Sequence, residues 1–138
     1  MVKDYILIAE DDEDDQFLLK SAFNEIDYHV DLVFVNNGID LLDHFREVDK
    51  GSISRLPLLL VVDLNMPKKN GKEAIKELSG RQYFRDFTTI IFSTTSNDAE
   101  KSKCRELGVN DFFVKPSNYK DLIEVVNTFK TLAVAGDR

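Results

Sequence analysis

Five short runs of aliphatic and β-branched residues constrain the fold of this chain more than any other feature of its sequence. Each run is four to six residues long, as expected for a β-strand. Their first residues are 25, 28, 30 and 23 positions apart, which leaves room each time for a turn and a helix of about three turns. The five runs are Tyr5–Ala9, Val30–Val35, Leu58–Val62, Thr88–Phe92 and Asp111–Val114.

Between and after these runs, apolar residues recur at three- and four-residue intervals, as on the buried face of a helix. The clearest stripe ends near residue 133, and a weaker one over 97–107 ends at Gly108, a favourable residue just after a helix. Asn97 and Asn118 are the expected N-caps of the last two helices. The residues predicted to face the core are Leu18, Ala22 and Ile26; Ile39, Leu42 and Phe45; Ala74, Ile75 and Leu78; and Leu122, Val125, Val126, Phe129 and Leu132.

Strict alternation of strand and helix predicts an α/β fold, with a doubly wound, five-stranded parallel sheet and five flanking helices. The run Tyr5–Ala9 is apolar throughout, as expected when helices cover both faces of the sheet. The 138 residues correspond to about one domain. Because no linker divides the chain, we expect a single domain over 1–138, with its core at about 3–133, a short C-terminal tail and no separate DNA-binding output domain.

The composition argues against several classes of function. The net charge of −7 disfavours nucleic acid or an anionic membrane as the main partner. No apolar run approaches the ~20 residues of a membrane span, and the first four residues turn acidic too early for a secretory signal. Cys104 is alone, so it has no disulfide partner in the chain, as is typical of a reducing cytosol. We therefore expect a cytoplasmic protein that is not inserted in a membrane.

The negative charge is concentrated in the first part of the chain. Residues 1–50 contain 14 acidic and 4 basic residues, whereas residues 51–138 contain 11 acidic and 14 basic ones. Six of the acids form one unbroken run, from Glu10 to Asp15, which starts where the first predicted strand ends.

This acidic run divides into two parts. Glu10 and Asp11 follow the strand directly, where a metal ion would be within reach. Glu13, Asp14 and Asp15 fall in the first turn of the next helix, where the helix dipole favours negative charge; Asp12 is intermediate. An EF-hand is excluded because Gln16 stands where that loop requires glycine.

Polar side chains follow four of the five runs at the point where each strand is expected to end. The carboxyl ends of parallel strands share one edge of the sheet, which is where open α/β sheets bind ligands. The sequence therefore predicts one site that combines carboxylates, hydroxyls and a lysine. Its candidate members are Glu10, Asp11 and Asp12 after the first run, Asp63 after the third, Ser93, Thr94, Thr95 and Ser96 after the fourth, and Lys115 after the fifth.

These residue types point to phosphoryl transfer assisted by a metal ion. Carboxylates within a few ångströms repel one another and raise one another's pKa unless a cation lies among them. A few hard oxygen ligands suit Mg²⁺, which keeps some of its water and shares its coordination with a phosphate. A hydroxyl and a lysine can donate to phosphoryl oxygens. The chemistry expected is a carboxylate that accepts a phosphoryl group.

Four segments of the chain, each at the end of a predicted strand, resemble those of response-regulator receiver domains, the phospho-accepting modules of two-component signalling. The resemblance extends over about residues 3–133. Each segment alone is weak evidence, but together, each at the proper strand end, they are specific. The second segment also resembles stand-alone regulators of the chemotaxis type and those that pair with bacterial phytochrome kinases. The segments are I-L-I-A-E-D-D at 6–12, V-V-D-L-N-M-P-K-K-N-G at 61–71, F-S-T-T-S at 92–96 and G-V-N-D-F-F-V-K-P at 108–116.

The resemblance implies the fold's strand order, 2-1-3-4-5 as in flavodoxin-like proteins, and a role for each site residue. Asp63 matches the phospho-accepting aspartate, and Ser93 and Lys115 match the residues that contact the phosphoryl group. Phe112 matches the aromatic switch that changes rotamer on phosphorylation. The implied Mg²⁺ ligands are Asp11, Asp63, the backbone carbonyl of Asn65, and Glu10 through water.

Several points stay open at this level. Thr94 competes with Ser93, although counting back from the Lys-Pro pair favours Ser93. Phe112 stands where many relatives carry tyrosine, so no hydroxyl contact is available, and an aromatic residue on a strand can equally be plain core. The resemblance also implies a cis peptide bond between Lys115 and Pro116.

The leading hypothesis is a response regulator that takes a phosphoryl group onto Asp63 from a histidine kinase or a phosphotransfer protein. It would signal by a phosphorylation-dependent contact with a downstream protein, through the fourth helix, fifth strand and fifth helix. Such a protein is a signalling domain, not an enzyme with a small-molecule substrate, and catalyses only its own phosphotransfer and autodephosphorylation.

Two alternatives come from other classes. A haloacid-dehalogenase-like phosphatase also uses an aspartate at a strand end, but it requires a second acid where this chain has Asn65. A flavodoxin-like flavin binder requires a loop rich in Thr, Ser and Gly after the first strand, where this chain carries its acidic run.

Overall fold

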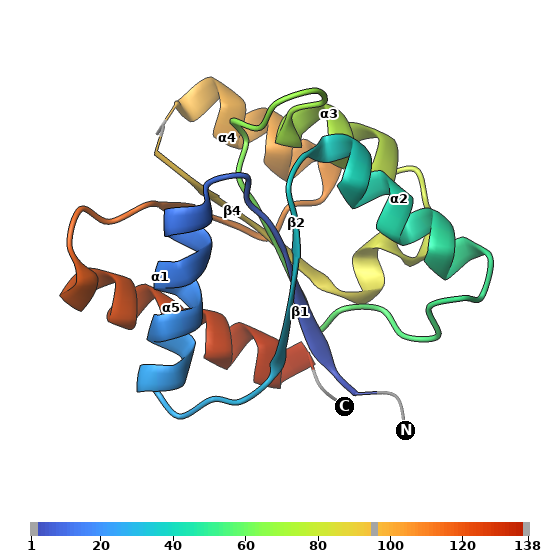
Figure 1. The fold of residues 1–138 in the computed structure, drawn as a ribbon. Helices are drawn as coiled ribbons and strands as arrows, with labels where there is room; N and C mark the ends of the chain where they lie inside the picture. The colour runs from blue at the N-terminus through green and yellow to red at the C-terminus, as the bar shows by residue number, and fades with distance from the viewer. Residues whose placement is uncertain (1–2, 95–96, 137–138) are drawn as a thin grey trace.

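The computed structural model describes residues 3–94 and 97–136 and consists of one parallel sheet covered by helices on both faces (Figure 1). The strands lie in the order β2-β1-β3-β4-β5, as predicted. They are β1 (Tyr5–Ala9), β2 (Asp31–Val35), β3 (Leu59–Val62), β4 (Thr88–Ser93) and β5 (Asp111–Val114). The helices are α1 (Glu13–Glu25), α2 (Gly38–Asp49), α3 (Gly71–Leu78), α4 (Asp98–Leu107) and α5 (Tyr119–Gly136), with a short 3-10 helix, η1 (Gln82–Asp86), before β4.

All five predicted strands are present, and their ends differ from the prediction by one residue at most. The sheet has a helical layer on each face: α1 and α5 cover one face, and α2, α3 and α4 cover the other (Figure 1). In β1, Ile6 and Ile8 pack under α1 and α5, whereas Leu7 and Ala9 face the opposite layer. Because side chains alternate along a strand, only a continuously apolar run satisfies both layers.

The predicted stripes of α1 and α2 are wrong at their first residue, whereas the predicted Ala22, Leu42 and Phe45 are buried. Leu18 is 40% exposed while Leu19 is buried, and Ile39 is 42% exposed while Leu41 is buried. In α1, Leu19 and Phe23 at four-residue spacing are buried together with Ala22 and offer more apolar area than Leu18 would. The helix is therefore rotated to bury this pair.

The later helices agree more closely with the prediction. The Asn97 side chain accepts hydrogen bonds from the first N–H groups of α4, and that helix ends at Gly108 with a φ of 109°. Asn118 caps α5 by accepting from the Asp121 N–H at 2.9 Å. Helix α5 continues to Gly136, beyond the end expected near residue 133.

The expected cis bond before Pro116 is wrong, since no peptide bond among the described residues is cis. A trans X–Pro bond is the more stable form by about 0.5–1 kcal/mol. It is also compatible with the hydrogen bond that fixes Lys115, whose N–H donates to the Ser93 carbonyl at 2.8 Å. In the part of the chain that the structure describes, no helix combines the length and apolar character needed to cross a bilayer.

Gly71, the first residue of α3, closes the loop that follows β3. A Cβ at this position would lie 2.3 Å from the carbonyl oxygen of Asp63 and 2.8 Å from a methyl carbon of Val62. The Gly71 N–H also donates to the Leu64 carbonyl at 3.2 Å. The close approach of α3 to Asp63 therefore requires glycine at this position.

We expect Gly71→Ala to lower the free energy of unfolding by about 1–3 kcal/mol, because the added methyl group collides with backbone. Urea denaturation measures the change. Gly80→Ala is the matched control, since a Cβ there would lie 3.4 Å from its nearest neighbour, the Glu77 carbonyl oxygen. Equal stability of the two variants would contradict the packing argument.

Candidate functional site

The backbone of each central site residue is held by the neighbouring strand at the carboxyl edge of the sheet. The Glu10 N–H donates to the last carbonyl of β2 at 2.9 Å, and the Asp63 N–H donates to the last carbonyl of β1 at 3.0 Å. The Lys115 N–H donates in the same way to the last carbonyl of β4. The hydrogen bonding of the sheet thus continues one residue past each of these strands, and it fixes the backbone from which the three side chains extend.

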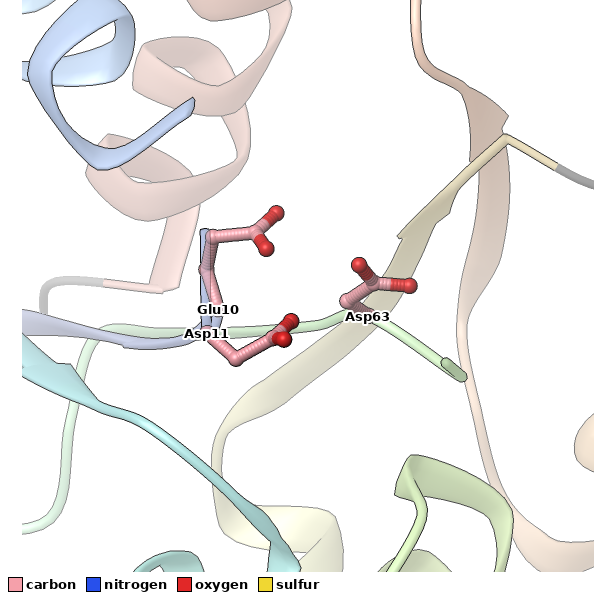
Figure 2. A group of neighbouring side chains, drawn as sticks. All are labelled: Glu10, Asp11 and Asp63. Atoms are coloured by element: carbon pink, nitrogen blue, oxygen red, sulfur yellow. The ribbon is translucent and has the colours of Figure 1, made fainter. Parts of the chain in front are cut away.

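Three carboxylates meet at this edge. Oxygen atoms of Glu10, Asp11 and Asp63 all lie within 4.8 Å of one another. Figure 2 shows Glu10 and Asp11 next to each other after β1, across from Asp63 at the end of β3. Glu10 and Asp63 are buried, whereas Asp11 is exposed. The sequence prediction that these three acids lie together is confirmed by this geometry.

The Lys115 ammonium group lies among the carboxylates and contacts three of them. It donates to Glu10, and to Asp15 and Asp63 at 2.9 Å each. The Lys115 side chain is only 11% exposed, so its bonds to the buried Glu10 and Asp63 form largely out of water, whereas Asp15 lies at the edge of the site with 37% of its side chain exposed. Asp15 was expected to be a helix-start residue alone, and its contact with Lys115 is a part of the site that sequence reasoning missed.

Asp63 uses both of its oxygens. Oδ1 accepts from the Asn65 N–H at 3.0 Å, and Oδ2 accepts from Lys115. The Asn65 side chain lies 3.5 Å from the hydroxyl of Ser93, which is fully buried at the end of β4. Thr94, the competing hydroxyl, is exposed. The remaining hydroxyl candidates, Thr95 and Ser96, lie outside the described residues.

Burial and hydrogen bonding act in opposite directions on the pKa values of Glu10 and Lys115. Burial raises the pKa of the Glu10 carboxyl to about 7, against the lowering effect of hydrogen bonds from Lys115 and the Asp12 N–H. Burial acts to lower the pKa of Lys115, but hydrogen bonds to Glu10, Asp15 and Asp63 outweigh it and raise that pKa above its ordinary value. The lysine is therefore charged, and it compensates carboxylates that burial would otherwise neutralise.

The donor atoms fit a divalent cation. Magnesium binds oxygen ligands at about 2.0–2.1 Å, which places neighbouring ligand oxygens about 3 Å apart and opposite ones about 4 Å apart. The oxygens of Glu10, Asp11 and Asp63 lie within 4.8 Å, so small side-chain movements bring them to that geometry. A cation at this point competes with Lys115 for Glu10 and Asp63.

Polar residues of the neighbouring loops support the site. The Asp12 side chain caps α1 by accepting from the Asp15 N–H at 3.0 Å. Asp12, which the sequence left between the metal-site acids and the helix-start acids, therefore belongs to the start of the helix. Gln16 donates to the Glu10 carbonyl at 2.6 Å and to the Asn36 side chain at 2.9 Å. The sequence offered no sign of the Gln16 contacts, because they depend on how α1 is rotated.

A further backbone contact joins the loops after β2 and β3. The Gly38 N–H donates to the Lys69 carbonyl at 2.8 Å, and a Cβ on Gly38 would lie 2.2 Å from that carbonyl oxygen. The loop after β1 is joined to the loop after β2 through Gln16 and Asn36. Three of the loops around Asp63 are therefore connected to one another.

Phe112 lies on β5, away from the carboxylates. Its ring is partly buried against the core under α2, α3 and α4. The Lys101 ammonium group of α4 lies 5.3 Å from the centre of this ring. Phe112 is thus at the contact between β5 and α4, where a change of rotamer would alter that surface.

The sequence and the fold agree with those of a known protein family. The model of the response regulator receiver domain family matches residues 6–127. The chain belongs to this family. A receiver domain is a signalling domain that accepts a phosphoryl group from a histidine kinase, which excludes the haloacid-dehalogenase and flavodoxin alternatives for this chain.

Individual relatives agree with this assignment. Response regulator Rcp1 of Synechocystis is 26% identical over 121 residues, which are 88% of this chain and 82% of the relative. The structure of Mn²⁺-bound Rcp1 has a TM-score of 0.81 at 25% identity and covers 93% of this chain and 92% of that one. The fold also matches the phosphorylated cyanobacterial phytochrome response regulator RcpA, with a TM-score of 0.86 at 23% identity over 99% and 98% of the two chains.

We expect Lys115 and a bound cation to stabilise this receiver domain through the same partners, Glu10 and Asp63, so that either one can compensate for the absence of the other. Lys115→Met should lower the free energy of unfolding in the absence of divalent cations by about 1–3 kcal/mol, because Glu10 and Asp63 lose a charged donor. Mg²⁺ should then restore more stability to the variant than it adds to the wild type, since binding to the folded state alone stabilises it. Urea denaturation in EDTA and in Mg²⁺ measures both effects.

Lys120→Met provides the control, because Lys120 is an exposed lysine in the first turn of α5 and its removal changes the net charge equally. The same gain from Mg²⁺ in Lys115→Met and Lys120→Met would show that Lys115 and the cation do not share their partners.

Proposed function

We propose that this receiver domain accepts a phosphoryl group on Asp63, with Mg²⁺ held by Glu10, Asp11, Asp63 and the backbone carbonyl of Asn65. The observation that carries the proposal is the convergence on Asp63 itself. One of its oxygens is oriented by the Asn65 N–H, and the other lies 2.9 Å from the only ammonium group that contacts the cluster in the described part of the chain.

The transfer requires a nucleophile and charge stabilisation, but no proton from the protein. A carboxylate oxygen of Asp63 forms the new bond to phosphorus while the bond to the donor's imidazole nitrogen breaks. The donor ring, which carries a proton on its other nitrogen, takes the electron pair of that bond and leaves as neutral imidazole. When bound, Mg²⁺ neutralises charge on the phosphoryl oxygens. Lys115 and the Ser93 hydroxyl donate to these oxygens as they move toward Asp63.

The metal-ligand proposal is specific for a small, hard cation. Carboxylate and carbonyl oxygens with room for water are the ligands that Mg²⁺ prefers. The Mn²⁺-bound form of Rcp1 supports a divalent cation in a relative of 25% identity. It is the abundance of Mg²⁺ in the cytoplasm, where we place this protein, that leads us to name Mg²⁺.

We propose a histidine kinase or a histidine phosphotransfer protein as the donor, and a downstream protein as the target. The run D-L-N-M-P-K-K-N-G supports a kinase of the phytochrome type. Phosphotransfer assays against kinases of several classes test this choice, and preferential transfer from a kinase without a phytochrome sensor would contradict it.

The chemistry predicts that Asp63→Asn abolishes phosphorylation, because an amide oxygen cannot form the acyl phosphate. Wild-type protein incubated with acetyl phosphate and Mg²⁺ should gain the mass of one phosphoryl group, and Asp63→Asn should gain none. Intact-protein mass spectrometry reads this directly. Asp31→Asn, an exposed residue at the other end of the sheet, is the control and should behave as wild type. Phosphorylation of Asp63→Asn to wild-type level would refute the assignment.

For the output, we propose that Ser93 is drawn toward the phosphoryl group and that Phe112 then turns inward, which alters the face of α4, β5 and α5. Its support is the position of Phe112 beside Lys101 of α4.

Beryllofluoride with Mg²⁺ should therefore shift the ring resonances of Phe112 in the NMR spectrum of phenylalanine-labelled protein. Comparison with Phe112→Leu assigns these signals. The shift should be absent in Asp63→Asn, and an unchanged Phe112 environment in wild-type protein that binds beryllofluoride would contradict the switch role.

A further inference from the structure

The contact between Asp15 and Lys115 is not explained by the roles assigned above. The two residues lie 100 positions apart in the chain, and their charged atoms are 2.9 Å apart. An ammonium group has three N–H donors, and Lys115 directs them to Glu10, Asp15 and Asp63. A phosphoryl oxygen that binds Lys115 must therefore take the place of one of these acceptors.

Asp15 differs from the other two acceptors of Lys115 in one respect. Glu10 and Asp63 belong to the group of acids that converge to hold a cation, and Asp15 does not. When a cation and a phosphoryl group engage Glu10 and Asp63, the carboxylate that remains for Lys115 is Asp15. Resting on the function proposed above, we propose that Asp15 is a positioning residue that holds the Lys115 ammonium beside Asp63 during phosphoryl transfer.

The local structure of α1 leaves the Asp15 carboxylate available for this task. Asp15 is the third residue of the helix, where an acid ordinarily reaches back to the N–H of the N-cap residue. Here the N-cap is Asp12, and its N–H donates instead to Glu10 at 3.1 Å. The Asp12 side chain in turn caps the Asp15 N–H. The helix start is thus satisfied without the Asp15 side chain, which points to Lys115.

Holding the ammonium group matters because a lysine is a point charge on a flexible stem. In the transfer, an oxygen of Asp63 forms the bond to phosphorus, and the leaving group departs with the electron pair of the bond that breaks. Neither Asp15 nor Lys115 gains or loses a proton. Asp15 acts through the position of the Lys115 charge, which has to lie where the phosphoryl oxygens arrive.

The alternative is that Asp15 merely adds negative charge to the first turn of α1. Asp14 is the matched control, because it lies in the same turn, carries the same charge and is exposed. Asp14→Asn and Asp15→Asn therefore change the helix dipole interaction and the net charge alike, and only the latter removes the contact with Lys115.

The experiment uses the full chain and measures two affinities for each variant: Mg²⁺ alone, and beryllofluoride at saturating Mg²⁺, both by isothermal titration calorimetry. We expect Asp15→Asn to bind beryllofluoride about tenfold more weakly than Asp14→Asn, because its ammonium group is misplaced. The Mg²⁺ affinities of the two variants should agree. Asp15→Glu, which keeps a carboxylate, should recover part of the loss and also serves if Asp15→Asn fails to fold.

A spectroscopic measurement separates positioning from a general loss of stability. In the beryllofluoride complex, the Lys115 ammonium signal should be sharp in the wild type and in Asp14→Asn, and broadened in Asp15→Asn, where the group rotates and exchanges more freely.

The outcomes distinguish the two proposals. Wild-type protein that fails to bind beryllofluoride would overturn the proposed function itself. Wild-type binding with equal affinities in Asp14→Asn and Asp15→Asn would overturn only the positioning role. A parallel loss of Mg²⁺ and beryllofluoride affinity in Asp15→Asn would also overturn it, because Asp15 would then act on the cation.

Discussion

The contact of one ammonium group with buried carboxylates is the interaction on which the rest of the site depends. Glu10 is 2% exposed, and an ionised carboxylate at that depth requires a positive partner. Lys115 supplies it and thereby links the ends of β1, β3 and β5. The sheet pairing that extends past each strand fixes the backbone, and the ion pairs then fix the side chains.

In the proposed function, the lysine and the cation share two partners, Glu10 and Asp63. A cation would bind Glu10 and Asp63 as Lys115 does, so Lys115 supplies positive charge to these two carboxylates when no metal is bound. In the proposed function, phosphorylation is an exchange of partners, in which Lys115 gives up Glu10 and Asp63 for phosphoryl oxygens and keeps Asp15.

The sequence was sufficient for the sheet, for its strand ends and for the meeting of Glu10, Asp11 and Asp63, because strand ends translate directly into positions at one edge. It was insufficient wherever the rotation of a helix decides the outcome. Leu18 and Leu19 fit the helical period almost equally well, so the sequence alone does not show which of them is buried. In the same way, the position of Asp15 in the first turn of a helix does not show that its side chain contacts Lys115. Contacts between residues 100 positions apart leave no local pattern to detect.

The connected loops on the β2 side have a consequence for how a signal leaves the site. Gln16 and Asn36 join the first two loops, and Gly38 joins the second to the third through the Lys69 carbonyl. These bonds connect three of the loops around Asp63 on one flank of the site. If Asp63 is phosphorylated as proposed, the loops on this flank are already hydrogen-bonded to one another, so we expect the response to run across the sheet toward β4 and β5.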